Sequence, residues 1–401
     1  MGGHRPFVAA LLLPVAALAG SHRSFVRRET SAVIGAAGLA GGFRTRSDGL
    51  AELAAARARL RVGFAIFVTD VRDKSYEDAI AVLAHGIRQS AQRSRDDVEV
   101  LALAPTRLDS RSDLALRRAG IQKILKFPLL VDPDIIQRPQ VREAQLKHSS
   151  DGSFQFAEEQ IKYYGLHLTE FDRVLVLDAD CMVLEPMDEL MRLPEDLVAT
   201  YDHGLDTSHS TTAPVQGGFL LFRPSLQDLD AIRNLTIEGD FRYDGTGWLG
   251  TGIGFAYGGT GPDGMLAYFY QRGALPHLQD VGKAQLPERL RAPPLAGSRL
   301  RAVDRAVYDV VLNERLRREV DDLDHDSVLR AVKSAHFTGD CPKPWSCLAP
   351  GHWLCEGLHD RWWKQRSELE ASRGLTASPQ ACQEGHYVPI AQVTDGSAMA
   401  A

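Results

Sequence analysis

Two acidic residues directly after an apolar run are the strongest chemical signal in this sequence. Asp178 and Asp180 follow residues 174–177, an uninterrupted apolar segment with the length and composition of a buried strand. Side chains two residues apart on a strand point to the same side, so both carboxylates can approach one cation. Carboxylate oxygens are hard donors that suit Mn²⁺ or Mg²⁺. The sequence therefore predicts a divalent-metal site at the end of this strand.

An Asp-x-Asp pattern is not specific by itself. The strand in front of Asp178 and Asp180 sets this pair apart, because ligands of open α/β sheets bind at the carboxyl ends of the strands. A strand-end turn without a metal is the alternative that this context leaves open. The chain contains four further pairs, none of which follows such a strand: Asp132/Asp134, Asp228/Asp230, Asp322/Asp324 and Asp324/Asp326.

The elements that would position this pair alternate short apolar runs with amphipathic stretches, which is typical of βαβ units. The expected fold is therefore α/β, a single Rossmann-like domain with a mostly parallel central sheet flanked by helices. The glycine-rich region 245–264 is expected to be a loop that lines a site, and the charge run 316–326 a solvated helix and turn. Strands are expected at 62–68, 98–104, 121–127, 174–177 and 219–222, and helices at 76–90, 114–119 and 156–168.

Charge limits the classes of partner. The chain has 401 residues and a formal net charge of −6, which disfavours a nucleic-acid-binding protein. Positive charge gathers at the N-terminus, where residues 1–61 hold nine arginines and three acidic residues.

The N-terminus resembles a targeting segment. Arg5 precedes an apolar run at residues 7–19 that ends in small residues, the layout of a secretory signal peptide. The run is short and contains Pro14, which disfavours a membrane span; a buried N-terminal helix is the weaker alternative. An arginine-rich, acid-poor stretch at residues 20–46 follows, so targeting to a plastid or another organelle is the second interpretation, after the secretory pathway and Golgi lumen.

Cysteine placement fits an oxidising lumen. Cys181 lies in an apolar stretch and is expected in the core, and Asn234-Leu235-Thr236 is a glycosylation sequon. A zinc site is the competing interpretation of the other cysteines, but no CxxC pair supports it. Those four allow two disulfides in three connectivities: Cys341, Cys347, Cys355 and Cys382.

The segments around Asp178 and Asp180 hold further residues in a fixed order. Lys162 lies in an expected helix and precedes Tyr163-Tyr164-Gly165-Leu166, and Asp188-Glu189-Leu190 follows the strand. This order resembles glycosyltransferase family 8, the glycogenin-like transferases of the GT-A fold. The resemblance covers roughly residues 62–346, with strong motifs and loose sequence between them.

The resemblance implies roles for the residues at the strand end. Asp178 and Asp180 would hold the metal, and Ala179 and Lys162 would contact the nucleotide-sugar donor. Without the resemblance, an exposed helix lysine would be the better interpretation of Lys162.

Two more segments match in the family's order. Phe67-Val68-Thr69, with Tyr76 at the start of a helix, resembles the nucleotide-binding start of the family. This implies that Thr69 lies at the nucleotide and that the Tyr76 ring stacks on uracil, since stacking tolerates different bases. The strand segment that begins at Gln216 and ends in Arg223-Pro224-Ser225 resembles the family's Asn-Ser-Gly strand.

A third match lies near the end of the resemblance. His336-Phe337-Thr338-Gly339 with Lys343-Pro344-Trp345 resembles the family's His-x-x-Gly-x-x-Lys-Pro-Trp element. The resemblance implies that His336 is the third metal ligand and that Gly339 and Lys343 hold the diphosphate.

The sequence departs from the family pattern in three places. Pro262 falls where a straight alignment expects an aspartate, and Asp263 comes one position later; Gln216 replaces an asparagine; and Cys341-Pro342 adds one residue before Lys343. Proline cannot exchange a proton, so Asp263 must supply the carboxylate or that role is absent.

The resemblance implies a metal-dependent, retaining transfer of a hexose from a UDP-sugar to an unidentified glycan, lipid or protein acceptor. Lys162 would stabilise the leaving group, and Gln216 and Asp263 would orient sugar and acceptor. The implied division is a targeting segment and linker (1–58), a catalytic domain (59–350) and a cysteine-containing extension (351–401), with a homodimer as a further expectation.

Two other functions were weighed against the transferase. A non-catalytic lumenal protein that binds nucleotide-sugars or glycans on the same fold has Pro262 as its main support. A sugar-1-phosphate nucleotidyltransferase is disfavoured, because residues 69–74 contain no glycine for a phosphate loop.

Overall fold

The computed structural model describes residues 59–71, 73–148, 155–202, 214–255, 258–271, 299–376 and 382–390. The predicted targeting segment lies outside these residues and stays a prediction. None of the described helices combines the length and the apolar character that crossing a membrane requires.

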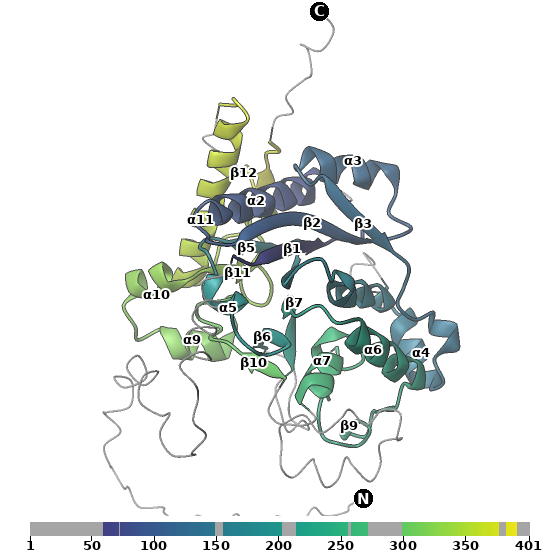
Figure 1. The fold of residues 1–401 in the computed structure, drawn as a ribbon. Coiled ribbons are helices and arrows are strands. Elements are labelled where there is room, and N and C mark those ends of the chain that lie inside the picture. The colour runs from purple at the N-terminus through teal and green to yellow at the C-terminus, as the bar shows by residue number, and fades with distance from the viewer. Residues whose placement is uncertain are drawn as a thin grey trace, which may run out of the picture. The chain divides into compact units, whose positions relative to one another are not determined.

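A seven-stranded sheet forms the centre of the described fold (Figure 1), in the order β10-β6-β7-β4-β1-β2-β3. Strand β7 runs antiparallel to both of its neighbours, and every other neighbouring pair in this sheet is parallel. The predicted α/β class with a mostly parallel sheet is therefore confirmed. The strands are β1 (Arg61–Phe67), β2 (Asp97–Pro105), β3 (Lys123–Phe127), β4 (Arg173–Asp178), β6 (Leu197–Tyr201), β7 (Val215–Phe222) and β10 (Leu300–Ala302).

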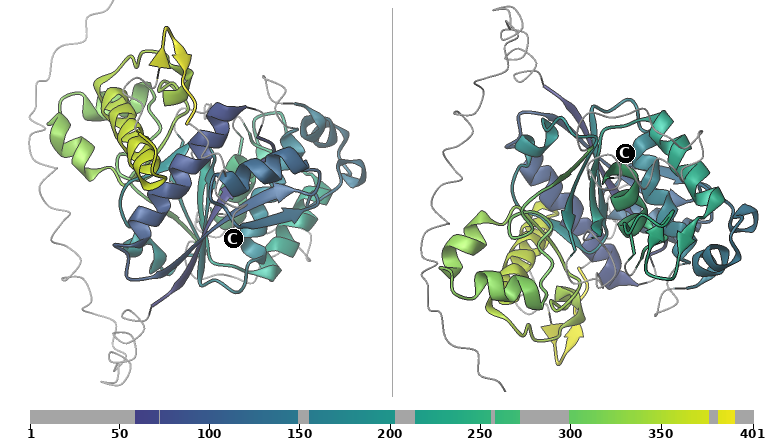
Figure 2. Two further views of the ribbon diagram at one scale, coloured as in Figure 1. Left: turned by 90° about the horizontal axis from the view of Figure 1, so that it is seen from above. Right: turned by 90° about the horizontal axis from the view of Figure 1, so that it is seen from below.

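Helices cover both faces of the sheet (Figure 2). On β1, Phe64 and Ile66 point into the hydrophobic core shared with α2 (Lys74–Ala91). Ala65 and Phe67 point into a second core on the other face. A strand buried on both faces must be apolar along its length, which is why β1 and β4 are continuous apolar runs. The second core also contains residues of α7 (Pro262–Gln271) and of the 3₁₀ helix η2 (Phe156–His167).

Sequence patterning located most of these elements. The expected helix at 114–119 begins earlier, as α3 (Ser110–Arg118), because the Asp109 side chain accepts a hydrogen bond from the Ser112 backbone N–H and caps it. The stretch expected as a helix at 156–168 is helical but has 3₁₀ geometry in η2. Strands β6 and β10 were not expected. The charge run at 316–326 forms the solvated helix and turn that were predicted, within α9 (Glu314–Val320) and the start of α10 (His325–Ala331).

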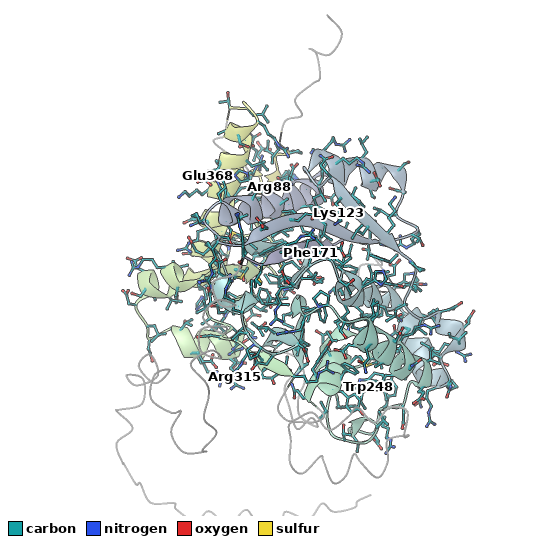
Figure 3. All side chains as sticks on the ribbon, in the orientation of Figure 1. Arg88, Lys123, Phe171, Trp248, Arg315 and Glu368 are labelled. Atoms are coloured by element: carbon teal, nitrogen blue, oxygen red, sulfur yellow. A yellow bond between two sulfur atoms is a disulfide. The ribbon has the colours of Figure 1, made fainter. Side chains whose placement is uncertain are left out.

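The glycine-rich region is irregular, as predicted, but also contains one short strand, β9 (Gly247–Trp248), which pairs with β8 (Phe241–Arg242) just before the region. Its packing centres on Trp248, labelled in Figure 3, which is fully buried and donates its indole N–H to the Gly259 carbonyl at 2.8 Å. The region leads directly into α7. It therefore anchors the start of that helix on a buried aromatic side chain.

The C-terminal part packs against the same core. Helix α11 (Trp353–Ser372) lies against α2, and β5 (Cys181–Val183) pairs antiparallel with β11 (Ser334–His336). Two disulfides, Cys341–Cys355 and Cys347–Cys382, select one of the three predicted connectivities and exclude the zinc interpretation, because all four sulfurs are bonded. The remaining elements are η1 (Pro133–Ile135), α4 (Pro139–Leu146), α5 (Asp188–Met191), α6 (Leu226–Glu238), η4 (Pro344–Ser346), β12 (Cys382–Gln383) and β13 (His386–Tyr387).

Candidate metal centre

The antiparallel strand β7 brings its first residues to the carboxyl end of β4. Leu177 pairs with Phe219, so Gly218 lies beside Asp178. A Cβ on Gly218 would be 2.4 Å from His336 Cε1 and 2.9 Å from Asp178 Oδ2. Only glycine leaves room here for an imidazole and a carboxylate to meet.

His336 reaches the strand end through the pairing of β11 with β5. In this ladder His336 is the partner of Cys181, which follows Asp180. The His336 Nε2 atom is 3.1 Å from Asp180 Oδ1 and 4.0 Å from Asp178 Oδ2. Possible ligand atoms of Asp178, Asp180 and His336 all lie within 4.8 Å of one another. Ligands about 2.1 Å from an octahedral ion stand about 3–4 Å apart, so these three side chains fit one divalent cation.

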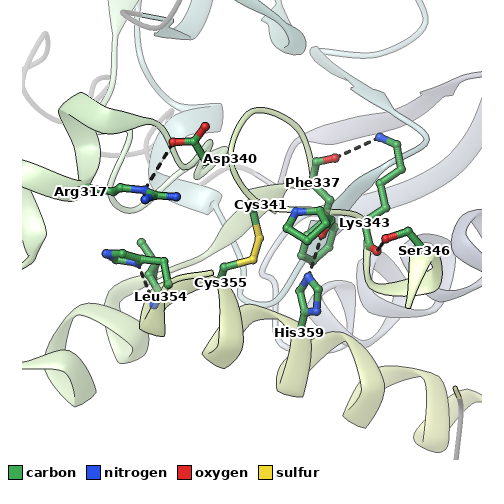
Figure 4. Close-up of a disulfide and its surroundings, with 11 residues drawn as sticks. Arg317, Phe337, Asp340, Cys341, Lys343, Ser346, Leu354, Cys355 and His359 are labelled. Carbon is green, nitrogen blue, oxygen red and sulfur yellow. Dashed lines mark hydrogen bonds and ion pairs between the residues drawn. A yellow bond between two sulfur atoms is a disulfide. The ribbon is translucent and has the colours of Figure 1, made fainter. Parts of the chain in front are cut away.

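A lysine from the loop after β11 completes this side of the site. The Lys343 ammonium donates to the Asp180 carboxylate. It also donates to the Phe337 carbonyl at 3.0 Å (Figure 4). Gly339 makes the turn between His336 and Lys343: its φ is +67°, and a Cβ there would be 2.6 Å from the Leu312 carbonyl oxygen.

The N-terminus of α2 lies near the same loop. The Tyr76 ring makes an edge-to-face contact with Trp345, with 5.7 Å between the ring centroids. Thr69 follows β1 and is half-buried, as is Ala179 between the two aspartates. The residues predicted to contact the nucleotide therefore come from the ends of β1 and β4, the first turn of α2 and the loop after β11.

Lys162 is a buried cation and not an exposed helix lysine. It is 2% exposed, and its Nζ is 2.8 Å from Asp178 Oδ1 and 2.6 Å from Glu159 Oε2. It also lies over the Phe67 ring, 4.9 Å from the centroid. Burial opposes the charged form, but Asp178 and Glu159 raise the pKa of Lys162 above its ordinary value. Lys162 is therefore an ammonium at neutral pH.

Sequence reasoning missed Glu159. Its spacing of three residues from Lys162 on a helix was the available signal. Burial, together with the neighbouring Asp178 and Asp180, raises the pKa of Glu159, and Lys162 opposes this.

Asp263 reaches the site from the first turn of α7. Its Oδ1 accepts a hydrogen bond from the Gly217 backbone N–H at 3.0 Å. Burial, with a contribution from Glu159, raises the pKa of Asp263 to about 7, against the effect of Lys162. Pro262 opens α7, a position where the missing N–H of proline costs nothing.

Gln216 stabilises the start of β7. Its amide Nε2 donates to Asp202 Oδ2 at 3.1 Å, and its Oε1 accepts from the Gly218 backbone N–H at 2.7 Å. The side chain thereby holds the segment that carries Gly218.

The charges around His336 compensate one another. Burial disfavours an imidazolium, but Asp180 and Asp309 raise the pKa of His336 well above its ordinary value. Conversely, His336 and Lys343 lower the pKa of Asp180 despite its burial. Sequence reasoning also missed Asp309, because it stands as an isolated aspartate in a short apolar stretch.

No protein-family model and no curated protein matches the sequence. Among solved structures, the chain is similar to the bifunctional glycosyltransferase WbbM (13% identity, TM-score 0.40), over 79% of this chain but only 52% of WbbM. It is also similar to the galactosyltransferase LgtC in complex with donor and acceptor sugar analogs (15% identity, TM-score 0.38, 80% and 98% of the two chains). Mouse xyloside xylosyltransferase 1 is a third (10% identity, TM-score 0.39, 69% and 97%). Such low identities and TM-scores assign neither a family nor an activity, so membership of glycosyltransferase family 8 stays a prediction.

Proposed function

We propose that this protein is a metal-dependent glycosyltransferase that moves a hexose from a UDP-sugar to a glycan, lipid or protein acceptor and retains the donor's configuration. The observation that carries the proposal is the convergence of Asp178, Asp180 and His336, although 156 residues separate Asp180 from His336. A structural role would not require two carboxylates and an imidazole to gather around a position kept open by glycine.

Asp178, Asp180 and the His336 Nε2 atom would hold Mn²⁺ or Mg²⁺. When bound, the ion would supply Lewis-acid stabilisation of a diphosphate leaving group. The remaining roles fall to the chain's own residues.

Two lysines would neutralise charge on the departing UDP. Lys343 already bonds Asp180, and Lys162 bonds Asp178, so both ammonium groups flank the metal ligands. Preorganised cations stabilise charge that develops in the transition state. Tyr76 would stack on the base, with Trp345 holding its ring, and Gly339 would let the backbone approach the diphosphate.

Asp263 and Gln216 would orient the sugar and the acceptor. A carboxyl group whose pKa is about 7 can exchange a proton near neutral pH. The non-catalytic alternative is supported by Pro262, which occupies the position where the family pattern has an aspartate. Asp263, one position later, supplies a carboxyl group beside β7. This favours the transferase over the non-catalytic alternative.

The setting we propose is the lumen of the secretory pathway. Both disulfides favour an oxidising compartment. The plastid remains the alternative destination.

The test is UDP release by the full-length protein from a panel of UDP-sugars, with Mn²⁺, Mg²⁺ or EDTA. We expect metal-dependent release by the wild type and a loss of about 100-fold in Asp180→Asn, because a ligand and a partner of Lys343 are removed. Asp322→Asn is the matched control, since it alters an exposed carboxylate of another Asp-x-Asp pair that is not part of the candidate metal site.

Equal rates for wild type and Asp180→Asn would overturn the proposal. Binding of a UDP-sugar without release, across glycan, lipid and protein acceptors, would favour the non-catalytic alternative instead.

A further inference from the structure

A buried aspartate lies behind the histidine of the metal centre. Asp309 is 1% exposed. It precedes Val310, which forms a parallel bridge to Ala335 of β11. Its backbone N–H donates to Ser334 Oγ at 2.8 Å, and its Oδ2 accepts from the Thr200 hydroxyl, also at 2.8 Å. Backbone and carboxylate are therefore both fixed in place, next to the strand that carries His336.

The free oxygen of this carboxylate faces the imidazole. Asp309 Oδ1 is 3.5 Å from His336 Nδ1, and within the part of the chain that the structure describes neither atom has a hydrogen-bond partner elsewhere. A buried polar atom without a partner costs about 1–3 kcal/mol, so the two atoms are placed to satisfy each other. The ring thus has one nitrogen toward Asp309 and the other toward Asp180.

The backbone of Asp309 is strained to make this arrangement. Its φ is +50°, in the left-handed region that costs a residue with a side chain about 1 kcal/mol and that aspartate and asparagine tolerate best. Strain of this kind persists where the surrounding structure demands one position.

Cys181 is the other group beside Asp309 and His336. Its thiol donates to the Gly218 carbonyl at 3.5 Å, which leaves the carboxylate as the acceptor for His336.

We infer that Asp309 is a positioning residue of the metal centre, which accepts the Nδ1–H of His336 and so directs the Nε2 lone pair toward Asp178 and Asp180. This inference rests on the proposed function and deepens it. A carboxylate behind a histidine ligand fixes the ring tautomer and makes the ligand nitrogen more basic, and its loss typically weakens metal binding 10–100-fold.

The test measures Mn²⁺ binding directly, by the electron paramagnetic resonance signal of free Mn²⁺, in the full-length protein with a fixed excess of UDP. Asp309→Asn is the informative variant, because asparagine keeps the side chain's size and tolerates the positive φ. We expect its Kd for Mn²⁺ to rise about 10-fold and saturating Mn²⁺ to restore most of the turnover. Thr200→Val, which frees Asp309 Oδ2, should raise the Kd by a smaller factor.

Asp78→Asn is the matched control, since Asp78 is 0% exposed and lies in α2. A purely structural role for Asp309 would lower Tm in EDTA, as we expect of this control, and leave the Kd for Mn²⁺ at the wild-type value; that result overturns the inference. If Asp180→Asn abolishes Mn²⁺ binding in the same experiment, the proposed function still stands. If the wild type itself binds no Mn²⁺, the proposed function fails, and the inference fails with it.

Discussion

Two clusters of buried carboxylates in this protein differ in how their charge is satisfied. In the first, around Asp78, Lys74 lies 2.9 Å from Oδ1, and the Tyr387 hydroxyl and the Ile390 N–H donate to Oδ2 at 3.1 and 2.8 Å. In the second, around His336, three aspartates surround one imidazole, and among the described residues the ring is the nearest partner of Asp309 Oδ1. The first cluster anchors the C-terminal segment on α2. The second brings three carboxylates together around one histidine, with Lys343 on Asp180 and Lys162 on Asp178, in an arrangement that would suit a bound cation.

Buried charge that stabilises the fold has its partners in place already, whereas buried charge at a binding site would gain a partner from the ligand. Asp78 keeps its hydrogen bonds whether or not a ligand is present, so its contribution belongs to the folded state alone. The carboxylates at the end of β4 also have cationic partners, Lys162 and Lys343, but two neighbouring carboxylates would gain further from a bound cation. Metal should therefore change the stability of one cluster and not of the other.

The largest effect should come from filling the space between the ligands. Gly218→Ala would place a methyl group 2.4 Å from His336 Cε1, so we expect Mn²⁺ affinity to fall by about 100-fold or more as the ligands move apart. Isothermal titration with Mn²⁺ and UDP would measure it. Gly351→Ala is the control, because a Cβ there meets nothing within 4 Å; equal losses in both variants would contradict the geometry.

A second test alters the satisfied cluster. Asp78→Asn removes the charge that Lys74 pairs with, and we expect the free energy of unfolding to fall by about 1–3 kcal/mol, with Mn²⁺ affinity unchanged. Urea unfolding with and without Mn²⁺ would check this. A loss of metal affinity in this variant would break the distinction between the two clusters.

The smallest effect concerns Asp263. Because its folded-state pKa is raised to about 7, the native state binds a proton that the unfolded state releases near pH 4. Stability conferred by the protonated form is thus lost as pH rises from about 4 to about 7. In EDTA we expect the wild-type Tm to be lower at pH 8 than at pH 5.5. This fall in Tm should exceed the fall measured for Asp263→Asn by a few degrees. Thermal unfolding curves that change with pH identically in the two proteins would show that Asp263 does not titrate in this range.

Most of the sheet could be predicted because its strands are buried on both faces. The apolar run before Asp178 and the helical spacing of α2 identify their elements without tertiary information. Strand β10 has three residues, too few to show a period, and it exists only because β6 offers an edge to pair with.

The candidate metal centre was only partly predictable for a related reason. Asp178 and Asp180 share a strand, so local geometry places them together. Glu159 and Asp309 acquire their roles only when η2 and the segment before β11 fold against the strand end. Likewise, the disulfide pairing depends on where α11 docks, which the spacing of the cysteines does not encode.

The Cys341–Cys355 bond has a consequence for the order of the proposed donor site before a donor binds. It closes a covalent ring, with a sequence separation of 14, and Lys343 is held on that ring. Much of the conformational entropy of the lysine would therefore be lost during oxidative folding and not when a donor binds. More of the contact free energy would then be available for affinity. A chain made without oxidation should still form its sheet, yet hold the ammonium group of Lys343 less firmly and need more nucleotide to saturate it.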